Sequence, residues 1–188
     1  MAFSGHKIFG PSGIGALYGR YNLLNELNPF IVGGGTVKDS TYDNSVIEDI
    51  PQRFEAGLQD YAGIIGFSEA IRYFQNIGIE EAEKHIENLN RILTEEFNKL
   101  GIKILGVEDY KKRKGIISFN IEGINNKEIA EIFNQSNIFI RAGFHCVHSW
   151  FNANNIKGSA RISLSIYNTE EECRKVIEEL KKIQNLVK

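Results

Sequence analysis

The residues after Gly101 carry the pattern that most constrains how this chain folds. Short apolar segments typical of strands alternate there with longer amphipathic segments typical of helices. The expected strands are residues 102–105, 115–121, 138–141 and 160–166, and the expected helices are residues 126–135 and 170–187. Thr169 followed by Glu172 is a capping-box signal for the start of the last helix. The order strand, strand, helix, strand, strand, helix predicts a compact α+β unit that closes its own core.

Residues 1–100 show a different organisation. Glycine-rich turns occur at residues 10–15 and 33–35, and two helices are expected at residues 59–76 and 80–100. These elements cannot form a complete sheet with covered faces. Several apolar residues would then need a partner surface: Phe3, Ile8, Phe9, Phe30 and Ile31. We therefore expect two domains, residues 1–100 as part of a larger domain and residues 101–188 as a small complete one.

The composition argues against nucleic-acid-binding, membrane-spanning and disulfide-rich proteins. Lys and Arg number 22 against 24 Asp and Glu, a net charge of −2 that argues against nucleic acid as a partner. No apolar run approaches the roughly 20 residues of a membrane helix, and the N-terminus lacks a signal-peptide pattern. Two cysteines are too few for a disulfide framework. We expect a soluble cytoplasmic protein, and we expect the basic run at residues 111–114 to be a solvated turn rather than a docking patch.

Lys7, taken alone, is a weak candidate for chemistry. A lysine forms a Schiff base when its surroundings lower its pKa, and Ser4, His6 and local backbone N–H groups could hold an anion beside it. A solvated lysine beside a glycine turn is the more common situation.

Cys146 allows three interpretations. Arg141, His145 and His148 lie close in sequence and could favour the nucleophilic thiolate. Cys-x-His also supplies two metal ligands, but a zinc site needs three or four and no second pair is evident, so we expect no metal. The third interpretation is a structural cysteine, which is also the expectation for Cys173.

Arg161 could bind a carboxylate through its guanidinium or form a surface salt bridge. The sequence around Arg53 is a still less specific signal for a binding role.

Five segments taken together resemble the SUF-type (group II) cysteine desulfurases and selenocysteine lyases, which are class V PLP-dependent enzymes of the aminotransferase type I fold. In chain order these segments are Ser4-Gly5-His6-Lys7 with its glycine turn, Gly33-Gly34-Gly35, Arg53-Phe54-Glu55-Ala56-Gly57, Arg141-x-Gly143-x-His145-Cys146, and Arg161-x-Ser163-x-x-x-Tyr167-Asn168-Thr169. The resemblance implies an α/β fold in which this chain is the C-terminal portion: part of the large domain and the complete small α+β domain.

The resemblance also implies a role for each matching residue. Lys7 would bond covalently to PLP and abstract the substrate α-proton, and Ser4 and His6 would contact the PLP phosphate. Cys146 would attack the substrate sulfur and carry a persulfide, with Arg141 and His145 lining the loop around the thiol. Arg161 would bind the substrate carboxylate, with Arg141 beside it. PLP would act as the electron sink, leaving alanine.

The chain departs from the family pattern in two respects. Leu58 occupies the position of a threonine that reaches the phosphate of the neighbouring subunit's cofactor, so that contact is expected to be absent. The family's chains are also considerably longer, and the missing part supplies the aromatic residue stacked on PLP and the Asp on the pyridine nitrogen.

The leading hypothesis is therefore the C-terminal half of a cysteine desulfurase that donates sulfur to iron–sulfur cluster assembly or other sulfur biosynthesis. It would act on cysteine or selenocysteine as a homo-oligomer, a dimer above all, or together with an N-terminal half, and would pass sulfur to an acceptor protein. The alternatives are a truncated, non-catalytic remnant that acts by binding or dimerisation, and another class V PLP enzyme, which would have no use for the Cys146 thiol.

Overall fold

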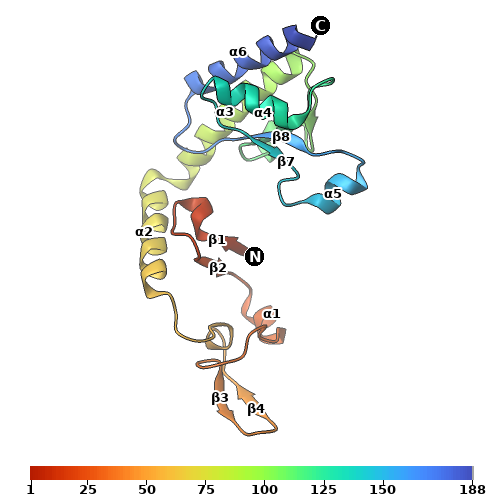
Figure 1. Cartoon of the computed structure of the whole chain (residues 1–188). Helices are drawn as coiled ribbons and strands as arrows, with labels where there is room; N and C mark the ends of the chain where they lie inside the picture. Colours follow the sequence, from red (N-terminus) through yellow and green to blue (C-terminus); the bar gives the residue numbers. More distant parts are fainter. Residues whose placement is uncertain (188) are drawn as a thin grey trace. The chain divides into compact units, whose positions relative to one another are not determined.

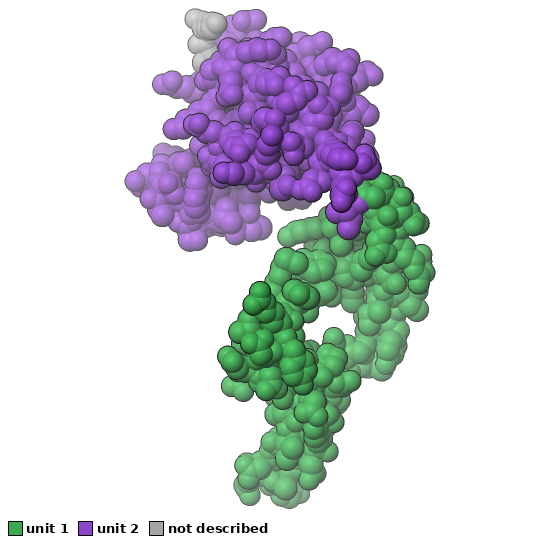
Figure 2. Space-filling model, turned by 180° about the vertical axis from the view of Figure 1, so that it is seen from behind, with its two compact units in different colours: residues 1–78 green, residues 79–188 purple. Residues whose placement is uncertain are grey.

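The computed structural model describes residues 1–187 and falls into two compact units, Met1–Gly78 and Ile79–Lys188 (Figures 1 and 2). The side chains of Leu186 and Val187 are outside the description. The division comes after Gly78 rather than after residue 100, where the sequence pattern places it. The helix that begins at Ile79 belongs to the second unit because its apolar face fills that unit's core.

The second unit is built on a four-stranded antiparallel sheet. Its strands are β5 (Ile104–Leu105), β6 (Ile116–Phe119), β7 (Arg141–Gly143) and β8 (Ser159–Ser163), in the spatial order β5-β6-β8-β7. β8 is therefore a central strand, paired with β6 on one side and β7 on the other. The six elements predicted from the sequence occur in the predicted order, and a short additional helix, His148–Ala153, lies between β7 and β8.

Three helices cover one face of this sheet: α3 (Ile79–Lys99), α4 (Asn126–Gln135) and α6 (Glu170–Val187) (Figure 1). Fully buried side chains from all three meet the sheet's apolar face; they include Leu89, Phe97, Phe133, Leu180, Ile117 and Phe119. Phe97 and Phe119 pack edge to face at 4.9 Å between ring centroids. Burial of this layer is the main stabilising contribution in the unit, because apolar burial dominates folding energetics.

Helix caps fix where two of these helices begin. Asn125 and Glu128 form a capping box at the start of α4. At α6, the backbone N–H of Thr169 donates to Glu172 and the backbone N–H of Glu172 donates to the Thr169 hydroxyl. This is the capping box predicted from the sequence, and it satisfies N–H groups that the first helical turn leaves free.

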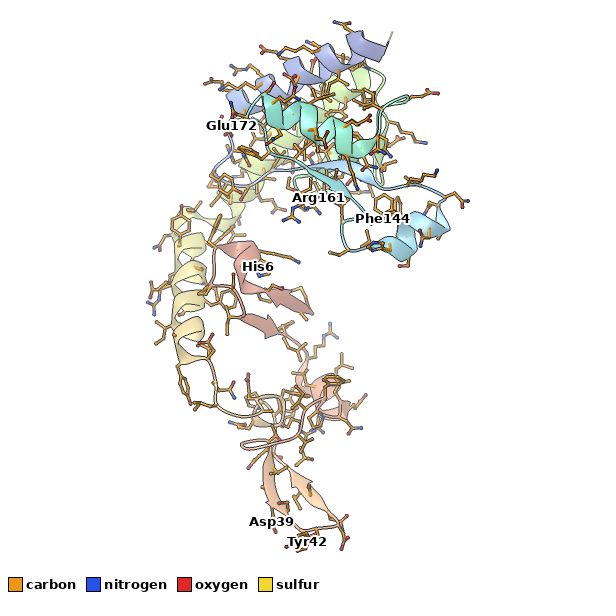
Figure 3. The ribbon with its side chains drawn as sticks, viewed as in Figure 1. His6, Asp39, Tyr42, Phe144, Arg161 and Glu172 are labelled. Carbon is orange, nitrogen blue, oxygen red and sulfur yellow. The ribbon has the colours of Figure 1, made fainter. Side chains whose placement is uncertain are left out.

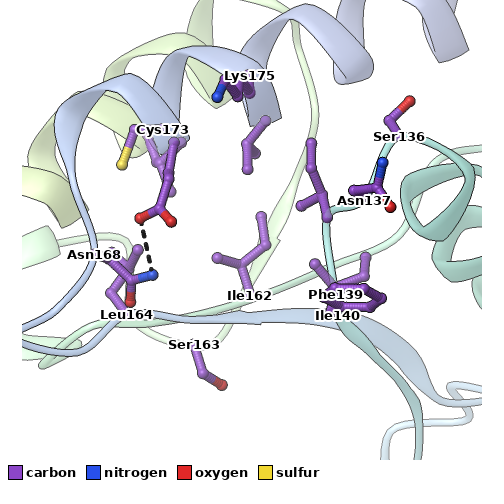
Figure 4. A pocket seen from close by; sticks show the side chains of 14 residues that line it. Ser136, Asn137, Phe139, Ile140, Ile162, Ser163, Leu164, Asn168, Cys173 and Lys175 are labelled. Atoms are coloured by element: carbon purple, nitrogen blue, oxygen red, sulfur yellow. Dashed lines mark hydrogen bonds between the residues drawn. The ribbon is translucent and has the colours of Figure 1, made fainter.

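Strands β7 and β8 diverge before Arg141, and a cavity of about 490 Å³ opens where they part. Its lining includes Ile138. Figure 4 shows Ile140, Ile162 and Ser163 of β8, and Cys173 of α6 around it. The divergence explains why β7 begins at Arg141 and not at residue 138 as the apolar pattern suggests. Asn137, with φ of 55°, turns the chain after α4 and directs residues 138–140 away from β8.

The first unit is a series of small elements. It contains β1 (Ala2–Ser4) paired with β2 (Gly15–Leu17), the 3-10 turn η1 (Gly5–Ile8), α1 (Tyr21–Glu26), the hairpin of β3 (Val37–Ser40) and β4 (Ser45–Ile47), η2 (Gln52–Phe54) and α2 (Tyr61–Ile77). Phe67 and Ala70 are its buried apolar side chains. Large apolar side chains remain exposed in it, including Phe30, Ile31, Tyr42, Leu58 and Ile65.

In the basic run at residues 111–114 the three lysines are exposed, as expected of a solvated turn, but Arg113 departs from that expectation. Arg113 is 9% exposed, and its guanidinium donates to the carbonyls of Val107 and Glu108 and to the hydroxyl of Thr94. Burial lowers the pKa of Arg113. The residue thus holds the loop after β5 and the short turn η3 (Tyr110–Lys112) against α3.

Among the described residues, no helix is long and apolar enough to cross a membrane.

Candidate functional site

Lys7 lies on the 3-10 turn η1, which joins the paired strands β1 and β2. Two backbone hydrogen bonds close this turn: Gly5 N donates to Ile14 O at 2.8 Å, and Gly10 N donates to Gly5 O at 2.9 Å. Phe9 follows in the left-handed region at φ 66°. The backbone of the Lys7 segment is therefore set by local hydrogen bonds, and Lys7 itself is exposed.

Glycines let this turn pack closely on α2. A Cβ at Gly10 would lie 2.7 Å from the Phe67 ring, and a Cβ at Gly5 would lie 3.1 Å from it. A Cβ at Gly66 would lie 2.7 Å from the Pro11 ring, so the glycine of α2 matches the proline of the turn. The glycines near Lys7 therefore serve close packing, and α2 acts as a rigid backing for the turn.

Polar groups of the first unit gather on this turn. Ser4 is half-buried at the N-terminal end of η1 and makes no capping bond with its side chain. His6 and Lys7 are exposed on the turn, and Figure 3 shows the position of His6. A hydroxyl, an imidazole and an amine within four residues form a donor set suited to a phosphate and an aldehyde carbon.

Arg141 and Arg161 are directly opposite each other on β7 and β8. Cross-strand partners point to the same face of a sheet, and on β8 the neighbouring residues Ala160 and Ile162 point into the core. Both arginines therefore lie on the face opposite the helices, where Figure 3 shows Arg161. Ser118 of β6 is the other cross-strand neighbour of Arg161 and joins the same row.

This arginine row has the properties of an anion site. Two like charges placed opposite each other on adjacent strands repel, and a bound anion removes the repulsion. The Nε of Arg161 is buried and has no hydrogen-bond partner among the described residues. Buried donors without a partner are rare in native proteins, so this one points to Arg161 as a functional candidate.

Cys146 lies in a tight loop that follows β7. Gly143 has φ of 119°, and His145 and Cys146 follow at φ 49° and 65°. Two successive non-glycine residues in the left-handed region cost about 1–3 kcal/mol each, so the surroundings must hold them there. Cys146 is a free, exposed cysteine, whereas Cys173 is buried in the core.

His145 contacts the sheet, and a group of aromatic rings packs beside this loop. The Nε2 of His145 lies 3.0 Å from both the carbonyl oxygen and the hydroxyl of Ser159 on β8. Phe144 stacks on His148 at 4.6 Å and meets Phe151 edge to face at 5.7 Å. His148 and Phe151 belong to the short helix α5 (His148–Ala153), which the sequence pattern did not reveal.

Charge and burial act on His145 in the same direction. Burial lowers the pKa of this imidazole, the charge of Arg161 lowers it further, and Arg141 adds a smaller effect. The hydrogen bond to Ser159 opposes these effects in part. Burial and the two arginine charges thus favour the neutral form of the His145 ring.

The sequence candidates thus fall into two groups. The first unit holds Ser4, His6 and Lys7 on one turn, and the second unit holds Arg141, His145, Cys146 and Arg161 at one end of its sheet. Sequence analysis missed Ser118 and Ser159, because strand register alone makes them neighbours of the site.

Arg53 makes a hydrogen bond within its own unit: its Nε donates to Glu48 O at 2.9 Å. Among residues 1–187, no group of three or more His, Cys, Asp and Glu side chains is arranged to hold a metal ion.

Comparisons with known proteins show which family the chain belongs to. The family model "Aminotransferase class-V" matches residues 1–176, a range that includes every candidate residue. A cysteine desulfurase of Haloferax volcanii is 37% identical over 179 residues, which make up 95% of this chain and 42% of that protein.

Two solved structures share the fold. The apo structure of a cysteine desulfurase from Thermococcus onnurineus NA1 has a TM-score of 0.88 at 34% identity and covers 97% of this chain and 46% of that one. The cysteine desulfurase CsdA from Escherichia coli has a TM-score of 0.85 at 27% identity, with 98% and 46% covered. The chain spans less than half the length of these relatives. It belongs to the class-V aminotransferase family.

Proposed function

We propose that this chain forms the C-terminal half of a PLP-dependent cysteine desulfurase that converts L-cysteine to L-alanine and leaves a persulfide on Cys146. The observation that carries the proposal is the exposed Cys146 thiol, held in a constrained loop that follows the arginine row of the same sheet. An aminotransferase needs a carboxylate-binding arginine but has no use for a nucleophilic thiol beside it. The assignment is in line with the relatives, which are named cysteine desulfurases.

The polar groups of the Lys7 turn fit PLP at its aldehyde and phosphate ends. Lys7 Nζ is exposed and can bond to the aldehyde carbon, and Ser4 and His6 can donate to phosphate oxygens. When bound, PLP supplies an electron sink for the substrate α-carbon. Lys7 Nζ also takes the α-proton of the substrate and returns a proton to the product.

The arginine row binds the substrate carboxylate. The guanidinium groups of Arg161 and Arg141, on the same face of the sheet, offer several N–H donors to two carboxylate oxygens. This contact holds the cysteine substrate at the end of the sheet that carries the Cys146 loop.

Cys146 takes the sulfur. Its thiolate attacks the substrate sulfur, an S–S bond forms, and the C–S bond breaks with its electron pair passing to the substrate carbon side. The carbon fragment then accepts protons and leaves as alanine, so that the sulfur atom remains as the outer atom of a Cys146 persulfide. A sulfur-acceptor protein, for iron–sulfur cluster assembly or other sulfur biosynthesis, would receive it.

The exposed apolar side chains of the first unit suggest that it binds another protein. Phe30 is fully exposed and Leu58 is 90% exposed, and such side chains usually mark an interaction surface when they are grouped. We propose that this unit packs against the N-terminal half of the enzyme and against a second subunit. Leu58 offers no hydroxyl, so it cannot hydrogen-bond the phosphate of a neighbouring subunit's cofactor.

The test compares thiol variants in the enzyme completed with an N-terminal half. Cys146→Ser should abolish alanine formation from cysteine, because a serine oxygen cannot accept the sulfur as a persulfide. Cys173→Ala is the matched control and should keep the activity, since Cys173 is 1% exposed and lies in the core. Full activity of Cys146→Ser would leave the Cys146 thiol structural and favour another class-V enzyme. Absence of activity in every completed form, together with stable dimerisation, would favour a binding module.

A further inference from the structure

The Cys146 loop has an anchor in the sheet that lies outside the chemistry proposed above. His145 and Cys146 both adopt the left-handed conformation, which only a few per cent of non-glycine residues adopt. Such a pair persists when contacts to rigid structure hold it. Ser159, which is fully buried in the central strand β8 and pairs with Gly143 of β7, is a rigid element of this kind.

The hydrogen bond between His145 and Ser159 defines the tautomer of the ring. A carbonyl oxygen only accepts hydrogen bonds, so the His145 Nε2, 3.0 Å from Ser159 O, must carry the hydrogen. The Ser159 hydroxyl, also 3.0 Å from Nε2, adds a second polar contact. In the neutral ring Nδ1 is then unprotonated. The Nε2–H of His145 donates to Ser159 O of β8, so it cannot at the same time donate to the substrate.

We infer that His145 is a positioning residue: its ring, anchored to Ser159 of β8, holds Cys146 in the left-handed conformation and presents the thiol in one orientation. The inference rests on the proposed function in that Cys146 is the sulfur-accepting residue. It gives His145 a role different from proton transfer.

His148 provides a matched comparison. It is also a histidine of the Cys146 loop region and stacks on Phe144 at 4.6 Å, but it is exposed and lies on α5 rather than against the sheet. Removing His148 therefore removes an aromatic contact of the loop and leaves the anchor to β8 in place.

The test measures the order of the loop directly. A nitroxide spin label is attached to Cys146 in the 188-residue chain, and its mobility is read by electron paramagnetic resonance. Cys173 is buried and serves as the folding control, since labelling there would reveal loss of the core. We expect His145→Ala to shorten the rotational correlation time of the label by roughly threefold, whereas His148→Ala should change it little.

Rescue separates a hydrogen-bonded anchor from simple packing. The side-chain amide of His145→Gln lies the same number of bonds from the backbone as Nε2 and can donate to Ser159 O, so this variant should restore most of the immobilisation. An unchanged spectrum in His145→Ala, or no restoration in His145→Gln with Cys173 still protected, would overturn the inference.

A measurement on the unsubstituted chain covers the case in which variants fail to fold. Two-bond nitrogen–proton correlation spectra of the imidazole should show His145 as the Nε2–H tautomer. The Nδ1–H tautomer would refute the anchor. These readouts do not depend on catalysis, so a loop that responds as expected in a protein without sulfur transfer would refute the proposed function alone.

Discussion

Replacing Arg161 with methionine should stabilise the second unit, although the residue is assigned to substrate binding. Arg161 faces Arg141 across β7 and β8, and its Nε is buried without a partner. Methionine keeps an apolar stem of similar shape and removes the charge. A group kept for ligand binding is expected to cost stability in the free protein.

The magnitude follows from the strand geometry. Opposite residues on adjacent antiparallel strands have Cα atoms about 5 Å apart. Two unit charges about 6 Å apart repel by about 0.7 kcal/mol at the dielectric constant of water and about 1.4 kcal/mol at half that value. Arg141 is exposed, which favours the lower figure. Relief of the unpartnered Nε adds about 1 kcal/mol. We expect Arg161→Met to raise the free energy of unfolding by about 1–2 kcal/mol.

Urea unfolding at low salt is the assay, followed through Trp150. This is the chain's one tryptophan and it packs on Phe151 at 5.1 Å, so its fluorescence reports on the second unit. Lys103→Met, at an exposed lysine of the same unit, controls for loss of a positive charge in general. The gain should shrink at 1 M salt, where the screening length is about 3 Å.

Two results would refute the reasoning. A loss of more than about 1 kcal/mol in Arg161→Met would mean that the guanidinium stabilises the fold through contacts of its own, at the magnitude of an ordinary hydrogen bond. Equal effects of Arg161→Met and Arg141→Met that add in the double variant would mean that the two charges do not interact.

Three further predictions use the chain as it stands. Purified protein treated with PLP and then borohydride should retain little cofactor, because partners for the PLP ring are expected from the N-terminal half; stoichiometric labelling that disappears in Lys7→Ala would contradict this. Sedimentation should show association that increases with concentration, owing to exposed apolar residues such as Phe30, and a monomer at all concentrations would count against it. Burial raises the pKa of the Cys173 thiol to about 11 from 9.0, so the native state holds this proton more tightly than the unfolded state. The contribution of this proton to the free energy of unfolding is therefore fully present below pH 9, and about 2–3 kcal/mol of it is lost as the pH rises toward 11. In Cys173→Ala the free energy of unfolding should depend less on pH between 9 and 11.

The second unit could be predicted from the sequence because its signals are local. Apolar periodicity identified the helices, and Thr169 with Glu172 identified the start of α6. Register is not local, and for that reason the pairing of Arg141 with Arg161 and the contact of His145 with Ser159 came only from the structure.

Other features escaped prediction for related reasons. Arg113 lies in a run of basic residues that predicts a solvated turn. Its burial depends on the carbonyls of a loop that folds back on α3. α5 is one short turn with no amphipathic pattern to reveal it. Residues 138–140 are apolar enough for a strand, but the turn at Asn137 keeps them from pairing with β8.

The central claim is that Cys146 receives sulfur from cysteine, and the mass of the Cys146 peptide tests it most directly. The completed enzyme is mixed with one equivalent of L-cysteine, quenched with an alkylating reagent and digested. The account predicts that the Cys146 peptide gains the mass of one sulfur atom, that the Cys173 peptide does not, and that alanine appears in equal amount. Alanine formed at the full rate with no added sulfur on Cys146 would contradict it.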